Sequence, residues 1–410
     1  MSASATAPLH GPLGPPVPDP VPPALELALL HQIVREVRVQ PDVGSLLCAV
    51  IDHLRAAGIR ISRCWAASVV LHPQAAASSW VWSDDACGMT VTQVDRQRLA
   101  FMRAIPSPLQ LLVAGMARYR FRHDPTVSCE FGLVRDLFAA GHTDYFALPV
   151  HFAGQVGGMV AWTTKAEGGF SASELALLQS AHPILQLAID THVQANIGAT
   201  LLRTYLGTDA GDRVRAGQVQ RGDGQTVPAA LWMSDLRGFT ALSERLERDA
   251  VLSLINDAFD ELVAAVHGAG GQVLKFIGDG MLATFSAEGD ETARRAACAA
   301  ALKAARVAHE RVDVLNLKRT AEGLEPVRFG LGLHVGDVLY GNIGGQDRLD
   351  FTVIGPAVNR VARIEGLCSQ LGRGILVSAE FAALCGEPMV ALGRFPLKGV
   401  AAAEEVFGLA

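Results

Sequence analysis

The order of strand and helix patterns in residues 227–410 limits the possible folds more than any other feature of the sequence. Leu252, Ile255 and Phe259 begin a run of apolar residues at three- and four-residue spacing, which predicts an amphipathic helix. Gly278-Asp279-Gly280 separates two apolar runs and is typical of a hairpin turn. The predicted elements are, in order, a strand at 229–233, a helix at 243–267, strands at 272–277 and 281–285, a helix at 291–312 and a strand that starts at 327.

This β-α-β-β-α-β order is that of a ferredoxin-like unit. Residues 327–334 and 338–343 are predicted to form a second hairpin around Gly336-Asp337, and a helix is predicted at 356–369. Short strand and helix patterns follow. The predicted fold class of this part of the chain is therefore α+β.

The preceding residues, 25–195, are predicted to form a separate α+β domain. Ser171 and Glu174 match a capping box, which predicts a long helix after them. Helical patterns cover 25–37 and 43–54, and strand patterns cover 64–71, 80–82, 145–152 and 156–164. A central hairpin followed by a long helix resembles the end of a GAF-type sensory domain, and this likeness implies a sensory or regulatory role.

Two further segments lie outside these domains. Residues 1–24 hold eight of the twenty prolines and no periodic apolar pattern, so a disordered tail is predicted. Residues 196–226 continue the long helix and then become rich in Gly, Asp and Arg. This segment is interpreted as a connector, either a transducer of a signal or a passive linker.

Charge and cysteine content exclude several classes of protein. The net charge is only −6 and no basic block occurs, which argues against a nucleic-acid partner. The seven cysteines are odd in number and include no CxxC pair, so a reducing, cytoplasmic location is predicted. The sequence opens without a signal-peptide pattern, and the long uncharged stretches at 64–83 and 146–164 are too polar and too rich in turn residues for a membrane span.

Three motifs in residues 227–410 carry a more specific signal. They are Met233-Ser234-Asp235-Leu236-Arg237-Gly238-Phe239-Thr240, Lys275-Phe276-Ile277-Gly278-Asp279-Gly280 and the run from Phe351 to Arg363, FTVIGPAVNRVAR. In this order and spacing they resemble the metal-binding and base-recognition signatures of class III adenylate and guanylate cyclases. The resemblance covers the whole of 227–410 and implies that this part is a nucleotide cyclase catalytic domain.

The chemistry of cyclisation explains the two aspartates. The ribose 3′-hydroxyl attacks the α-phosphate while pyrophosphate leaves, and two Mg²⁺ or Mn²⁺ ions per active site can activate the nucleophile and neutralise the triphosphate. Asp235 ends the first strand and Asp279 lies in the turn of the adjacent hairpin, and such ions prefer hard carboxylate oxygens. We therefore predict Asp235 and Asp279 as metal ligands, and the family pattern implies the backbone carbonyl of Leu236 as another.

Lys275 and Thr352 are the predicted base-recognition residues. A lysine only donates hydrogen bonds, which suits N1 of adenine, and the Thr352 hydroxyl can accept one from the 6-amino group. Guanylate cyclases of the family place an acidic residue at the position of Lys275, so ATP is the predicted substrate. Many adenylate cyclases place Asp at the position of Thr352. The threonine resembles the class IIIb subgroup, and because its hydroxyl can also donate, it leaves room for some reaction with GTP.

Further residues are predicted to contact the ribose and the phosphates. Asn359 and Arg363 stand four apart on one predicted helix and share a face. Asn359 would orient the ribose, and Arg363 would stabilise the charge that develops on the α-phosphate. The backbone amides of Phe239 and Thr240 lie at a predicted helix start and are suited to phosphate. Two basic residues resemble triphosphate-binding positions, namely Arg348 and Lys398.

The family assembles each active site from two subunits. Because this chain retains both sets of residues, a symmetric homodimer with two shared sites is predicted, and the N-terminal domain would regulate its geometry. The class IIIb likeness implies stimulation by bicarbonate. Two alternatives remain: a guanylate cyclase, which Lys275 disfavours, and a catalytically silent nucleotide-binding signalling module, which the presence of Asp235, Asp279 and Arg363 disfavours.

Overall fold

The computed structural model describes residues 23–70, 72, 75–152, 154–397 and 403–409. The chain divides into two compact units, residues 1–200 and 201–410, and each is described by itself. Most of the predicted tail, residues 1–22, lies outside the described residues. Helix α1 (Pro23–Val39) takes in the last two residues of the predicted tail, so the tail boundary at residue 24 was wrong by two residues.

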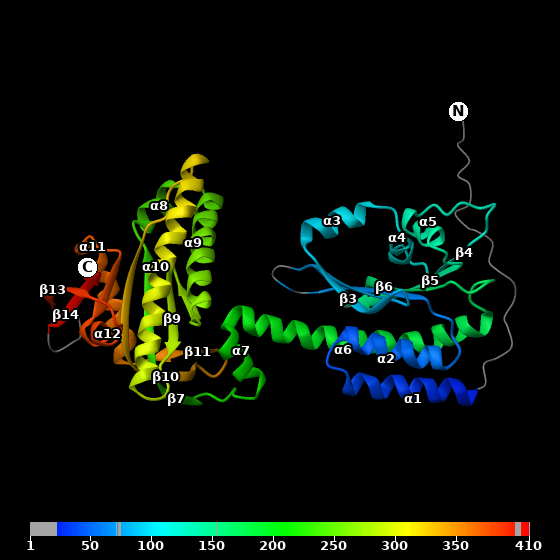
Figure 1. Ribbon diagram of the computed structural model, residues 1–410, viewed down its shortest axis with the longest axis horizontal. Helices are drawn as coiled ribbons and strands as arrows, with labels where there is room; N and C mark the ends of the chain where they lie inside the picture. Colours follow the sequence, from blue (N-terminus) through cyan, green and yellow to red (C-terminus); the bar gives the residue numbers. More distant parts are fainter. Residues whose placement is uncertain (1–22, 71, 73–74, 153, 398–402, 410) are drawn as a thin grey trace. The chain divides into compact units, whose positions relative to one another are not determined.

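The first unit is a sheet with helices on both faces. Its elements are α1, α2 (Val43–Ala56), β1 (Arg63–Val69), β2 (Ala77–Ser83), β3 (Ala86–Val94), α3 (Arg96–Ala104), α4 (Pro108–Val113), β4 (Tyr119–Arg122), α5 (Gly132–Ala139), β5 (Asp144–Phe152), β6 (Gln155–Thr164) and the first part of α6 (Ala172–Leu206). The strand order is β3-β2-β1-β6-β5-β4, with every neighbouring pair antiparallel. Figure 1 shows α2 and α6 along one face of this sheet and α4 and α5 on the other. The GAF-like nature of this unit stays a prediction.

The predicted capping box at the start of α6 is confirmed. The hydroxyl of Ser171 accepts a hydrogen bond from the backbone N–H of Glu174 at 3.2 Å, and the Glu174 carboxylate accepts one from the N–H of Ser171 at 2.7 Å. Glu174 also accepts from the guanidinium of Arg60. Burial alone would raise the pKa of Glu174, but these hydrogen bonds lower it to about 2.

The second unit contains the predicted ferredoxin-like order. Its elements after the end of α6 are α7 (Thr208–Arg215), β7 (Gly224–Leu236), α8 (Phe239–Arg245), α9 (Arg248–Gly268), β8 (Gln272–Ile277), β9 (Gly280–Ser286), α10 (Glu291–Ala321), β10 (Phe329–Gly344), β11 (Leu349–Ile354), α11 (Pro356–Gln370), β12 (Ile375–Ser378), α12 (Ala379–Leu384), β13 (Met389–Phe395) and β14 (Glu404–Leu409). The sheet order is β13-β14-β12-β10-β7-β9-β8, with β11 paired to β10. The segment β10-β7-β9-β8 is the βαββαβ sheet, which confirms the predicted α+β class.

The predicted second hairpin around Gly336-Asp337 was wrong. Residues 329–344 form one strand, β10, which pairs with β7 in unbroken antiparallel register from Phe329 to Gly341. The long partner strand keeps Gly336 and Asp337 extended, because they pair with Ala229 and Pro228 instead of turning. The actual hairpin joins β10 to β11.

Three helices also differ from the sequence prediction. The single helix expected at 243–267 is divided into α8 and α9, because Leu246 and Glu247 at the junction adopt extended backbone angles. Helix α10 runs to Ala321, beyond the predicted end at residue 312. The predicted connector contains a short helix, α7, of which Ala210 is buried in the core of the second unit.

The two faces of the second sheet are packed differently. Trp232, Met281 and Phe329 lie in an apolar core under α9 and α10, two helices that run side by side along this sheet (Figure 1). On the other face α11 approaches closely, because Gly330 and Gly332 lack side chains at the contact. A Cβ atom on Gly332 would lie 2.7 Å from the backbone nitrogen of Glu365 in α11.

No helix in the described part of the chain is long and apolar enough to span a membrane. Six cysteines with described side chains carry free thiols: Cys48, Cys64, Cys129, Cys298, Cys368 and Cys385.

Candidate active site

Asp235 and Asp279 meet at one corner of the second sheet. Asp235 is the penultimate residue of β7, and Asp279 lies in the turn that joins β8 to β9. In the register of β7 with β9, Asp235 pairs with Gly280, the residue that follows Asp279. Gly278 allows this tight turn because its φ of +63° lies in the left-handed region, which glycine adopts without strain.

The two carboxylates are close enough to share a proton. Burial, the charge of Asp279 and a hydrogen bond to Asp279 together raise the pKa of Asp235 to about 6, although a backbone hydrogen bond at Leu236 opposes the shift. Glycine at position 280 keeps this corner open, since a Cβ there would lie 3.2 Å from Oδ1 of Asp235. Two hard oxygen donors with surplus negative charge fit a divalent cation such as Mg²⁺ or Mn²⁺. Leu236, whose carbonyl was predicted as a further ligand, ends β7 directly beside them.

Lys275 and Thr352 are brought to neighbouring strands. Lys275 of β8 forms an ion pair with Asp350 of β11, with 2.6 Å between Nζ and Oδ2. Asp350 and Thr352 are two residues apart on β11 and therefore point to the same face. The side chain of Thr352 is 5% exposed, and its buried hydroxyl has no hydrogen-bond partner among the described residues. Buried hydroxyl groups are nearly always hydrogen-bonded, so the unpaired Thr352 hydroxyl is suited to form a hydrogen bond with a ligand.

Phe239 and Thr240 are the first two residues of α8, as predicted. Gly238 precedes them in the left-handed conformation with a φ of +69°, and only two residues separate the end of β7 from the start of the helix. The first backbone amides of a helix have no partner within it. These amides therefore follow Asp235 closely along the chain and suit a phosphate near the two carboxylates.

Asn359 and Arg363 lie on the exposed face of α11, opposite the face that packs on the sheet. Within the described residues no hydrogen bond or ion pair joins either side chain to Asp235 or Asp279. Arg348 is exposed in the turn between β10 and β11, whereas Gly330, the neighbour of Asp235, lies at the other end of β10. One chain thus does not bring these three residues to the paired aspartates. Lys398 lies outside the described residues.

Two acidic residues near the site were missed from the sequence. Asp350 gave no signal by itself, since only the packing of β11 against β8 places it against Lys275. Glu365 of α11 lies over Gly330, and burial raises its pKa to about 7, with the charge of Asp235 adding to the effect and Arg237 opposing it. The signal that could have revealed Glu365 is the pair Gly330 and Gly332, which mark a close approach of another element to the strand.

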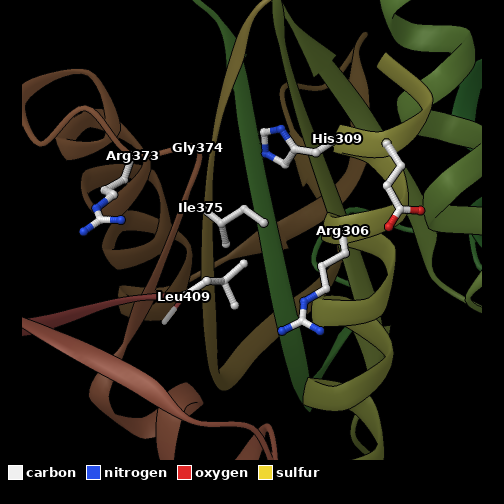
Figure 2. Close-up of a pocket in the computed structure, with 7 residues that line it drawn as sticks. Arg306, His309, Arg373, Gly374, Ile375 and Leu409 are labelled. Atoms are coloured by element: carbon white, nitrogen blue, oxygen red, sulfur yellow. The ribbon is translucent and has the colours of Figure 1, made fainter. Parts of the chain in front are cut away.

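A pocket of about 350 Å³ lies elsewhere in the second unit (Figure 2). Arg306 and His309 of α10 line one side, and Arg373, Ile375 and Leu409 line the other. The ring of His309 stacks on Phe329 at 4.2 Å between ring centres, on the α10 face of the sheet. None of the residues predicted for catalysis or binding lines this pocket, so the paired carboxylates remain the better candidate for the active site.

Part of the second unit is similar to known proteins. Residues 224–407 match the profile of the family described as "Adenylate and Guanylate cyclase catalytic domain". An adenylate cyclase of Anabaena cylindrica is 34% identical over 164 residues, which are 39% of this chain and 31% of that protein. Adenylate cyclase 1 of Rhizobium meliloti is 29% identical over 177 residues, which are 42% of this chain and 26% of that protein.

Among solved structures, the adenylyl cyclase CyaB from P. aeruginosa is 28% identical, with a TM-score of 0.42, over 46% of this chain and 96% of that one. The matched segment spans less than a third of each of the two curated relatives.

Proposed function

We propose that this chain is an adenylate cyclase that converts ATP to 3′,5′-cyclic AMP and pyrophosphate. The premise is that residues 224–407 belong to the family of adenylate and guanylate cyclase catalytic domains. The observation that carries the proposal is the placement of Lys275 beside the strand of Thr352, in the same unit as the paired carboxylates of Asp235 and Asp279. The first pair suits adenine and the second suits the metal ions that cyclisation needs.

In the proposed reaction the ribose 3′-oxygen forms a bond to the α-phosphorus while the bond from that phosphorus to the bridging oxygen of pyrophosphate breaks. The 3′-hydroxyl proton is released as the new bond forms. Two divalent ions held by Asp235, Asp279 and the Leu236 carbonyl would supply charge neutralisation and acidify that hydroxyl. The amides of Phe239 and Thr240 would bind phosphate oxygens, and Lys275 with Thr352 would hold the base.

Asn359 and Arg363 would complete this site from a second copy of the chain. Their exposure on α11, away from the aspartates of their own chain, supports this arrangement. Apolar side chains at the edge strand β8 support it too, since Phe276 and Ile277 are 49% and 48% exposed. A C₂ homodimer would then hold two equivalent sites. Arg363 would stabilise the charge that builds up on the α-phosphate, with Asn359 orienting the ribose. Arg348 and Lys398 would contact the triphosphate.

The direct test is product formation from ATP and from GTP by the full chain, with Mg²⁺ and with Mn²⁺, beside Asp279→Ala. We expect cyclic AMP from the unmutated protein and none from the variant. ATP bound without turnover by the unmutated dimer would instead identify a silent signalling module. A faster reaction with GTP than with ATP would identify a guanylate cyclase, which is the second candidate function. The unpaired Thr352 hydroxyl is compatible with guanine, because it can donate a hydrogen bond as well as accept one.

The shared site is tested by mixing two inactive variants. Asp279→Ala and Arg363→Ala each spoil both sites of their own homodimer, whereas a mixed dimer retains one intact site. We expect activity to reappear in the mixture, at up to a quarter of the unmutated rate if the chains exchange at random and each site acts independently. A mixture as inactive as its components, under conditions in which chain exchange is demonstrated, would contradict shared sites.

We assign residues 25–195 as a sensory domain, 196–226 as its connector and 227–410 as the catalytic domain. Helix α6 supports this, since its residues begin in the first unit and end in the second. Deleting residues 1–195 should change the rate or its response to effectors.

Bicarbonate is the proposed activator of the catalytic domain, because Thr352 resembles the class IIIb pattern. Adding bicarbonate at constant pH, with chloride as control, should raise the rate. A flat response would remove bicarbonate from the proposal.

A further inference from the structure

Glycines flank Asp235 on both neighbouring strands. Asp235 pairs with Gly280 of β9 on one side and with Gly330 of β10 on the other. Residues paired across strands point to the same face of a sheet, so no side chain stands beside the Asp235 carboxylate in this row. The space above Gly330 is filled from α11 instead.

Glu365 fills that space. A Cβ atom on Gly330 would lie 2.9 Å from Oε1 of Glu365 and 2.8 Å from Cβ of Cys368. At Gly332, two residues further along β10, it would lie 2.8 Å from the backbone oxygen of Val361. Helix α11 therefore rests directly on the strand, and the half-buried carboxylate of Glu365 is held over the cross-strand neighbour of Asp235.

Arg237 is fixed beside the same point. Its Nε lies 3.5 Å from the Cβ position of Gly330. The backbone N–H of Arg237 donates to the carbonyl of Arg328 at 2.8 Å, and its guanidinium donates to the carbonyl of Arg373, which follows α11. Nε itself is buried and finds no hydrogen-bond partner in the part of the chain that the structure describes. The charges gathered at this corner are thus three carboxylates, Asp235, Asp279 and Glu365, against one guanidinium.

The crowding of carboxylates at this corner is unfavourable without a cation and becomes favourable when a cation is bound. Like charges a few ångströms apart in a partly buried site repel by an amount that is large compared with thermal energy. A divalent ion on the two aspartates removes most of that repulsion. A group that only supported the packing of α11 would not need a charge, and an uncharged residue of the same shape would serve as well.

We infer that Glu365 is a positioning residue of the metal site, whose negative charge, held over Gly330 beside Arg237, strengthens the binding of divalent cations by Asp235 and Asp279. This rests on the proposed function, because the ions are those of the cyclase reaction. Glu365 lies behind the aspartates and is not itself assigned as a ligand. It sets the affinity for the ion and has no part in the choice of base.

The test measures Mn²⁺ binding without nucleotide. Full-length protein and Glu365→Gln are melted in EDTA and in rising Mn²⁺, and bound Mn²⁺ is counted by electron paramagnetic resonance. Residues that support metal ligands typically change metal affinity by about 10–100-fold. We expect Glu365→Gln to raise the half-saturating Mn²⁺ concentration about tenfold and to leave the melting temperature in EDTA unchanged or higher. The preference for ATP over GTP should stay unchanged.

Two controls make the result specific. Glu288→Gln removes an exposed carboxylate just beyond the opposite end of β9 and should behave as the unmutated protein. Arg237→Gln removes the guanidinium of the corner and should move both readouts the other way, to tighter Mn²⁺ binding and a lower melting temperature in EDTA.

The possible failures are distinguishable. Equal Mn²⁺ affinity in Glu365→Gln and the unmutated protein would overturn the role of Glu365 and leave the metal site intact. A lower melting temperature in EDTA with unchanged Mn²⁺ affinity would mean that Glu365 only supports packing. If the unmutated protein bound no Mn²⁺ at all, the metal site of the proposed function would fail together with this inference.

Discussion

The two faces of the sheet in the second unit are packed in opposite ways. The face under α9 and α10 buries large apolar side chains in one continuous core, and Trp232 is completely buried there. The indole N–H of Trp232 is hydrogen-bonded there, since it donates to the hydroxyl of Ser234 at 3.1 Å. The face under α11 has glycines where the strand meets the helix and crowded carboxylates at Asp235.

The apolar residues that stabilise the fold and the carboxylates assigned to the reaction therefore lie on opposite faces of one sheet. Burial of apolar surface and full hydrogen bonding stabilise the fold, whereas repelling charges and unpaired polar groups destabilise it. The crowded carboxylates lie on the face under α11 and include residues that the proposed reaction requires. Substitutions should therefore sort by face: one set should lower stability, and the other should lower activity without loss of stability.

The largest expected effect is on activity at the α11 face. Asp235→Asn keeps the shape of the side chain but removes a charge that is proposed to bind metal. Loss of about 4 kcal/mol of transition-state stabilisation would lower the rate about a thousandfold. Because the change also relieves repulsion with Asp279, the free energy of unfolding in EDTA should not fall. Cyclic AMP formation and urea denaturation of the same sample measure the two effects, and a clearly destabilised variant would break the separation of the faces.

The next effect is on stability at the α9 and α10 face. Trp232→Ala leaves a large cavity in a fully buried position, and truncations of this kind cost about 3–5 kcal/mol. We expect a strongly lowered free energy of unfolding by chemical denaturation. At a temperature where the variant is still folded, its ratio of ATP to GTP turnover should match that of the unmutated protein. A changed ratio would show that the two faces are coupled.

The contribution of His334 to stability is expected to depend on pH. Its ring is buried on the α11 face, with Nδ1 at 2.8 Å from the hydroxyl of Ser378, and Glu380 and Arg360 lie nearby. Burial lowers its pKa to about 4, an effect that Glu380 opposes and Arg360 strengthens. Because the folded pKa lies below the ordinary value of 6.5, the folded state excludes the proton. The resulting stability is fully present above pH 6.5 and is lost as the pH falls towards 4.

The shift corresponds to about 3 kcal/mol at most. Urea denaturation of the unmutated protein and of His334→Gln, at pH 7.5, 6 and 5, measures the difference in slope. We expect the variant to lose less stability than the unmutated protein on acidification. Parallel curves would show that His334 does not set the acid sensitivity.

The smallest expected effect is on base choice. Lys275→Met removes the donor assigned to adenine N1, and loss of one charge-assisted hydrogen bond costs about 2 kcal/mol, or roughly thirtyfold in kcat/KM for ATP. The value for GTP should change little or rise. Asp350→Asn serves as the matched comparison, because it removes the ion-pair partner and leaves Lys275 in place. Equal losses for ATP and GTP in Lys275→Met would assign Lys275 to phosphate instead.

The sequence revealed local features more reliably than distant contacts. The Ser171 capping box and the Gly278-Asp279-Gly280 turn depend on residues a few positions apart, and both are present. The turn predicted at Gly336-Asp337 relied on the same kind of signal and failed, because the long strand β7 pairs with both residues and holds them extended. Tertiary pairing can override a local turn preference whenever a partner strand is long enough.

The sequence by itself determined the ferredoxin-like order of elements and the positions of Asp235 and Asp279, since periodicity and short motifs encode both. Only the tertiary structure decided that Asp350 pairs with Lys275, that Glu365 lies over Gly330, and that the Thr352 hydroxyl is buried without a partner. The physical reason is that these contacts join residues far apart in the chain. A close approach between two elements depends on how the whole sheet and its helices pack, which no local pattern of side chains specifies.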